Sequence, residues 1–91
     1  MVLVDTCGWI EWLTDGPLAQ AFAASLAQTD ALLVPTLVQY ELAKWVTRER
    51  DETLAMEIIG LTQQAHVVLL DTSLALSAAA AALEHRLALA D

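Results

Sequence analysis

The residues of this chain that could take part in chemistry are mainly carboxylates. The two histidines have neither a cysteine nor a second histidine at the spacing of a zinc site. The three glycines lie far apart and form no glycine-rich loop for a phosphate, and Cys7 has no histidine at a predictable position to activate it. The acidic residues whose positions favour a function are Asp5, Glu41 and Asp91.

Asp5 is the best placed of the three, because it follows the first predicted strand, residues 2–4. In an open α/β sheet, ligands bind beyond the carboxyl ends of the strands, at the point where the strand order reverses. The other interpretation is that Asp5 or Thr6 only caps a helix that starts near Gly8. Position alone leaves both interpretations open.

Glu41 lies early in a helix predicted over residues 36–49, which the chain enters through Pro35. This helix follows the second strand, so Glu41 should also lie near the carboxyl ends of the strands. An ion pair with Lys44, worth only about a few tenths of a kcal/mol, is the simpler explanation. A carboxylate on the mostly apolar face that includes Trp45 favours a function instead.

Asp91 follows a leucine–alanine stretch that offers no charge partner, and a chain end is its other interpretation. Asp71 resembles Asp5 because it follows a predicted strand. However, Asp71 is followed by Thr72 and Ser73, which together make a strong helix-capping signal. We therefore assign Asp71 to structure.

Three short runs rich in valine and leucine have the composition of strands buried on both faces: residues 2–4, 31–34 and 66–70. Helices are predicted near Gly8 and over residues 17–28 (with Pro17 as a first helical residue), 36–49, 51–64 and 72–90. The crossovers are long enough for parallel pairing, and right-handed crossovers place strands two and three to one side of strand one. The expected fold class is α/β, with one half of an open parallel sheet.

Composition narrows the class of protein further. The 91 residues include 12 acidic and 4 basic ones, and the net charge of -8 argues against a broad basic face for nucleic acid. One cysteine excludes a disulfide framework and suits a reducing cytosol. The longest run poor in charge, residues 72–83, is short of the roughly 20 residues that cross a bilayer. We expect a soluble, cytoplasmic protein with no membrane partner.

Three motifs resemble those of the PIN-domain ribonucleases, with the closest likeness to VapC-type toxins of bacterial toxin–antitoxin pairs. The first motif, a strand ending in Asp followed by Thr or Ser, corresponds to VLVDT with Asp5 and Thr6. The second, a strand, a proline and a helix with an early Glu, corresponds to VPTLVQYE with Glu41. The third corresponds to LALAD with Asp91. Their order and spacing over all 91 residues make the resemblance specific.

This resemblance implies a three-layer α/β/α fold, of which the chain holds the first three strands and their helices. It implies that Asp5, Glu41 and Asp91 are ligands of Mg²⁺, or of Mn²⁺, and that Thr6 orients a ligand or water. The implied reaction is endonucleolytic hydrolysis of RNA. The family's toxins form homodimers and are inhibited by a cognate antitoxin, a partner that the negative charge of this chain would favour.

The chain departs from the family in two places. Cys7 stands where the family commonly has Asn, which removes a polar neighbour but no ligand. Family members also continue past the third Asp through a helix and a strand. We therefore expect residues 1–91 to be a single PIN-like domain that lacks this C-terminal segment.

Two other functions remain open at this point. In a noncatalytic α/β interaction module, the carboxylates would be caps and surface charges, and Glu41 would point away from Asp5. In a phosphate-handling hydrolase on a similar half-sheet, Asp5 alone would hold a metal beside a phosphate-binding turn. Spatial clustering of Asp5, Glu41 and Asp91 would favour the nuclease.

Overall fold

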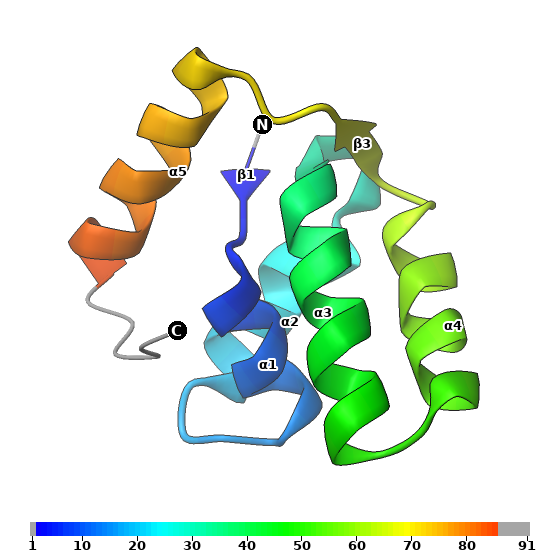
Figure 1. Cartoon of the computed structure of the whole chain (residues 1–91). Helices are drawn as coiled ribbons and strands as arrows, with labels where there is room; N and C mark the ends of the chain where they lie inside the picture. The colour runs from blue at the N-terminus through cyan, green and yellow to red at the C-terminus, as the bar shows by residue number, and fades with distance from the viewer. Residues whose placement is uncertain (1, 86–91) are drawn as a thin grey trace.

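The predicted parallel sheet is present in the computed structural model, which describes residues 2–85 (Figure 1). Its strands are β1 (Val2–Leu3), β2 (Leu32–Pro35) and β3 (His66–Val68), in the spatial order β1-β2-β3. Both pairings are parallel, with Leu3 opposite Leu33 and Val34 opposite Val67. The α/β class and the placement of the second and third strands to one side of the first are therefore confirmed.

The helices of the described residues are α1 (Thr6–Leu13), α2 (Ala19–Ala27), α3 (Thr36–Glu49), α4 (Glu52–Thr62) and α5 (Thr72–His85), with a short 3-10 helix η1 (Thr29–Ala31) before β2. The bounds of α3 are those predicted. The prediction for residues 72–90 holds as far as the structure describes the chain, and residues 86–90 lie outside that part. None of the helices within residues 2–85 has the length and apolar character needed to cross a membrane.

The predicted start of the second helix is wrong. The helix expected over residues 17–28 begins at Ala19, and Pro17 lies in the turn before it. The cause is Glu11, whose carboxylate accepts a hydrogen bond of 3.1 Å from the backbone N–H of Leu18. This contact fixes the turn ahead of α2, and no local pattern in the sequence predicts it.

The core is formed by β2 and by side chains of α1, α2, α3 and α4, of which α3 and α4 run side by side (Figure 1). Val34 of β2 and Leu42 of α3 are both 0% exposed. The expectation that all three strands are buried on both faces is wrong for the outer two. Val2 of β1 is 43% exposed and His66 of β3 is also exposed, since each strand forms an edge of the described sheet.

A partly buried polar contact joins α3 to α4. The Gln39 side-chain amide donates hydrogen bonds to the hydroxyl of Thr62 at 3.0 Å and to the side-chain oxygen of Gln63 at 3.2 Å. The Thr62 hydroxyl is fully buried and donates in turn to the carbonyl of Ile59 at 2.6 Å. A satisfied polar group inside a core permits few alternative packings, so this contact fixes the rotation of α3 about its axis.

Two helical glycines should respond in opposite ways to alanine. A Cβ on Gly8 of α1 would lie 2.5 Å from a methyl carbon of Val4 and 2.8 Å from the Phe22 ring, whereas a Cβ on Gly60 of α4 meets nothing within 4 Å. We expect Gly8→Ala to lower the free energy of unfolding by about 1–3 kcal/mol through overpacking. Gly60→Ala should raise it by about 0.5–1 kcal/mol. Urea denaturation measures both, and equal stability of the two variants would contradict the close packing at Gly8.

Candidate functional site

Asp5 caps the first helix of the chain. Its backbone is extended, and its Oδ1 accepts a hydrogen bond of 3.0 Å from the backbone N–H of Gly8. The helix begins at Thr6, two residues before the expected start, because Asp5 rather than a later residue is the cap. The capping interpretation is thus confirmed. It does not exclude a second role, since a carboxylate has about four acceptor positions and this bond uses one.

Glu41 contacts the residue next to Asp5. The Thr6 hydroxyl donates a hydrogen bond of 2.5 Å to Glu41 Oε1, which joins the start of α1 to α3 across 35 positions of sequence. Within the described residues Glu41 forms no ion pair with Lys44, whose ammonium instead lies over the Tyr40 ring, 5.9 Å from its centroid.

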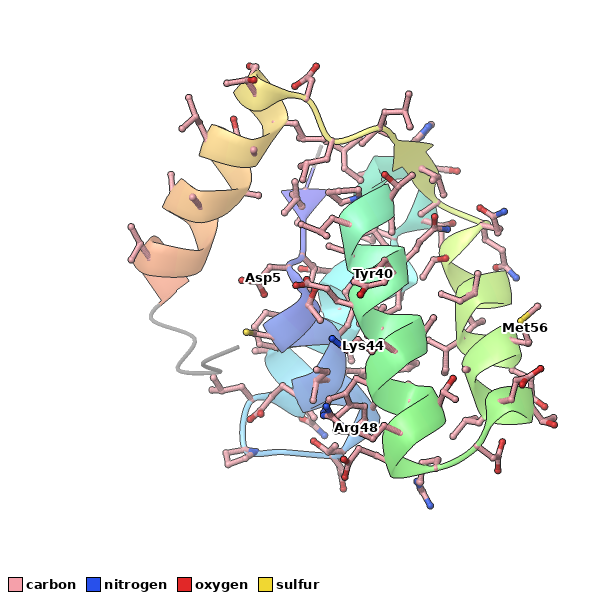
Figure 2. The ribbon with its side chains drawn as sticks, viewed as in Figure 1. Asp5, Tyr40, Lys44, Arg48 and Met56 are labelled. Atoms are coloured by element: carbon pink, nitrogen blue, oxygen red, sulfur yellow. The ribbon has the colours of Figure 1, made fainter. Side chains whose placement is uncertain are left out.

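The sheet explains why these side chains meet. β1 and β2 are parallel neighbours, so their carboxyl ends lie at the same edge, and α1 and α3 both begin there. Pro35 ends β2 in an extended conformation, and α3 starts at the following residue. Figure 2 shows Asp5 near the end of β1, level with Tyr40 of α3. Glu41 contacts Thr6, the neighbour of Asp5, so both carboxylates lie near the carboxyl edge of the sheet, where the sequence places them.

The face of α3 that carries Glu41 differs from the expected one. The buried residues of α3 are Val38, Leu42 and Val46, which β2 and α4 cover, whereas Glu41 itself is exposed. Tyr40 on the same side is 61% exposed. The Glu41 carboxylate is therefore open to a ligand rather than enclosed among apolar side chains.

The third predicted carboxylate, Asp91, lies outside the described residues. Within residues 2–85, no group of three or more His, Cys, Asp and Glu side chains is placed to hold a metal ion. The donors near the first helix are the carboxylates of Asp5 and Glu41 and the hydroxyl of Thr6. Oxygen donors of this kind fit a hard cation such as Mg²⁺ or Mn²⁺ better than a soft one.

Asp71 has the structural role that its sequence context predicts. Its Oδ1 accepts a hydrogen bond of 2.8 Å from the backbone N–H of Leu74 at the start of α5. Asp51 does the same for α4, accepting from the backbone N–H of Leu54 at 2.7 Å. Asp5 differs from both because Thr6 beside it holds a second carboxylate.

Two positive charges lie next to Glu41 on the face of α3 that the three- and four-residue spacing of the sequence predicts, and they are enough to contact one or two phosphates. Lys44 and Arg48 follow Glu41 by three and seven residues on the exposed side of α3. The helical period of about 100° per residue places these positions within one sector of the helix.

A family model described as PIN domain matches residues 2–91 of the chain. Searches among curated proteins and among solved structures gave no significant match. The matched segment includes Asp5, Thr6, Glu41 and Asp91. The family match and the contacts at the start of α1 therefore concern the same edge of the sheet.

Two substitutions of Asp5 should separate its capping role from its charge. Asn is as good an N-cap as Asp, so we expect Asp5→Asn to change the free energy of unfolding by less than about 0.5 kcal/mol. Asp5→Ala removes the acceptor and should lower the free energy of unfolding by about 1 kcal/mol. Urea denaturation compares the two variants with the wild type. Wild-type stability of Asp5→Ala would show that Asp5 does not cap α1.

Proposed function

Because the chain belongs to the PIN domain family, we propose that it is a metal-dependent endoribonuclease that hydrolyses phosphodiester bonds of RNA. PIN domains are usually nucleases and generally bind divalent metals. The observation that carries the proposal is the hydrogen bond from Thr6 to Glu41, which brings the second acidic motif to the first. An exposed carboxylate held at the carboxyl edge of a parallel sheet is in the position where such folds bind ligands.

In this proposal Asp5, Glu41 and Asp91 hold Mg²⁺ or Mn²⁺. When bound, the metal supplies positive charge to the scissile phosphate and makes a coordinated water easier to deprotonate. The capping bond to Gly8 fixes the direction of the Asp5 carboxylate. The Thr6 hydroxyl fixes one oxygen of Glu41 and leaves its other oxygen to a ligand. Thr6 is thus a positioning residue for Glu41.

We further propose that the protein is a VapC-type toxin of the cytoplasm, inhibited by a cognate antitoxin and active as a homodimer. The three sequence motifs that resemble those toxins support this. Leu37 and Tyr40 are exposed apolar side chains near Glu41, and the net charge is -8. A partner that presents an apolar helix and a basic side chain would complement both features.

A noncatalytic interaction module is the second candidate, and one observation favours it. Asp5 caps its helix as Asp51 and Asp71 cap theirs, with the same kind of hydrogen bond to the backbone three residues later. The helix-capping role alone would therefore explain why an aspartate stands at position 5. It does not account for Glu41, which lies inside α3 and caps no helix.

RNA cleavage by the protein from its entire reading frame tests the nuclease directly. We expect cleavage with Mg²⁺ or Mn²⁺ and none with a chelator. Asp5→Asn and Glu41→Gln should each reduce the cleavage rate by at least about 100-fold, since even residues that only support metal ligands typically contribute 10- to 100-fold. The matched control is Asp51→Asn, the same substitution at another N-cap, which should retain the wild-type rate.

Two outcomes would contradict the proposed nuclease site. Full activity of both Asp5→Asn and Glu41→Gln would mean that the cleavage comes from a contaminant or from another site. Absence of cleavage together with absence of metal binding would favour the interaction module.

Substitutions of Thr6 test the positioning role separately. We expect Thr6→Val, which keeps the shape and removes the donor, to lower the metal-dependent cleavage rate by about 10- to 100-fold. Thr6→Ser keeps the hydroxyl and should stay within about threefold of the wild type, because the donor to Glu41 is retained. Equal rates for Thr6→Val and the wild type would exclude a role for the Thr6–Glu41 hydrogen bond.

A further inference from the structure

Positive charge is concentrated in one place on this acidic chain. The sequence has 4 basic residues against 12 acidic ones. Two of the basic residues, Lys44 and Arg48, lie on the exposed side of α3 that also carries Glu41. The net charge of the chain is -8, yet half of its basic residues lie beside the acidic site. This local positive charge can contact a polyanion.

The side chains form a row with an aromatic ring at one end. Tyr40, Lys44 and Arg48 follow one another at intervals of four residues, so each lies about 6 Å further along the helix axis than the last. Figure 2 shows the three labelled side chains in this order along α3, while Met56 lies on α4, and all three are exposed. We call Tyr40, Lys44 and Arg48 the α3 row.

Local contacts leave the α3 row available to a ligand. Tyr40 is 61% exposed, and the Lys44 ammonium lies over its ring without an ion pair within the described residues. Arg48 contacts Glu49 at 3.1 Å, but both side chains are exposed, at 61% and 49%. Ion pairs this exposed contribute little to stability, so Arg48 can exchange Glu49 for a phosphate.

We propose that the α3 row is a track that guides a single RNA strand to Glu41 and Asp5. Lys44 and Arg48 contact successive phosphates, whose spacing in an extended strand is similar to one helical turn. Tyr40, next to Glu41 in the sequence, stacks on an unpaired base near the bond that is cut. This inference rests on the proposed nuclease function and adds to it the side chains that would bind the RNA strand, with Tyr40 contacting a base that is unpaired, because a paired base cannot stack on a side chain in this way.

RNA binding without cleavage tests the track. The protein from the entire reading frame, with Asp5→Asn as background, is titrated into fluorescently labelled single-stranded RNA of mixed sequence, and anisotropy is followed over a range of salt concentrations. Lys44→Ala and Arg48→Ala should each lower the slope of log K against log salt by about 0.7, the loss of one phosphate contact on a single strand. Arg50→Ala, which removes the same charge at the end of α3 outside the row, should leave the slope unchanged.

Substitutions of Tyr40 should affect RNA binding differently from those of Lys44 and Arg48 in the same assay. Tyr40→Ala should weaken binding of single-stranded RNA by about tenfold or more without changing the salt slope, and Tyr40→Phe should restore it. Binding of a perfect RNA duplex should be weaker and insensitive to Tyr40→Ala. Because Tyr40 is exposed, its loss should not disturb the fold.

The track is wrong if the protein does not bind single-stranded RNA, or if Lys44→Ala and Arg48→Ala behave like Arg50→Ala. It is also wrong if these substitutions abolish binding of a protein partner but leave RNA binding unchanged. Metal-dependent cleavage by the wild type alongside unchanged RNA binding by the variants would reject the track and retain the nuclease. Loss of RNA binding in the variants without any cleavage by the wild type would reject the nuclease and retain the RNA-binding row.

Discussion

The parallel pairing of β1 with β2 brings the carboxyl ends of both strands to one edge of the sheet, and α1 and α3 start from that edge. The two predicted acidic motifs can meet only in this arrangement, since an antiparallel pairing would place Asp5 and Glu41 at opposite ends of the strands. Thr6 then completes the connection with its hydrogen bond to Glu41. The contact between Gln39 and Thr62 holds α3 in the rotation that turns Glu41 outward.

In the proposed nuclease, Asp5 combines the helix-capping role that the structure shows with a role as a metal ligand. Its bond to the Gly8 N–H sets the direction of the carboxylate before any ligand arrives, and such preorganisation is what a metal or phosphate site requires. The same residue type caps α4 and α5. What distinguishes Asp5 from these two caps is the neighbouring Thr6, which holds the carboxylate of Glu41.

Much of the framework could be predicted from the sequence, because it depends on local patterns and on chain handedness. Pro35 and the apolar spacing after it defined α3, and the right-handed crossover rule gave the strand order. The turn at Pro17 could not be predicted, because it depends on Glu11 reaching Leu18. The outward face of α3 depends on where β2 and α4 pack. The Thr6–Glu41 contact spans 35 positions, so sequence could place both residues at one edge but could not show that they touch.

Binding of Mn²⁺, followed by electron paramagnetic resonance, tests most directly whether Asp5 and Glu41 act as one cation site. The protein from the entire reading frame would be compared with Asp5→Asn, Glu41→Gln and the cap control Asp51→Asn. A shared site predicts that the wild type and Asp51→Asn bind Mn²⁺ alike, and that Asp5→Asn and Glu41→Gln each bind it at least about tenfold more weakly. Wild-type affinity in Glu41→Gln would contradict a shared site and leave Asp5 as a helix cap.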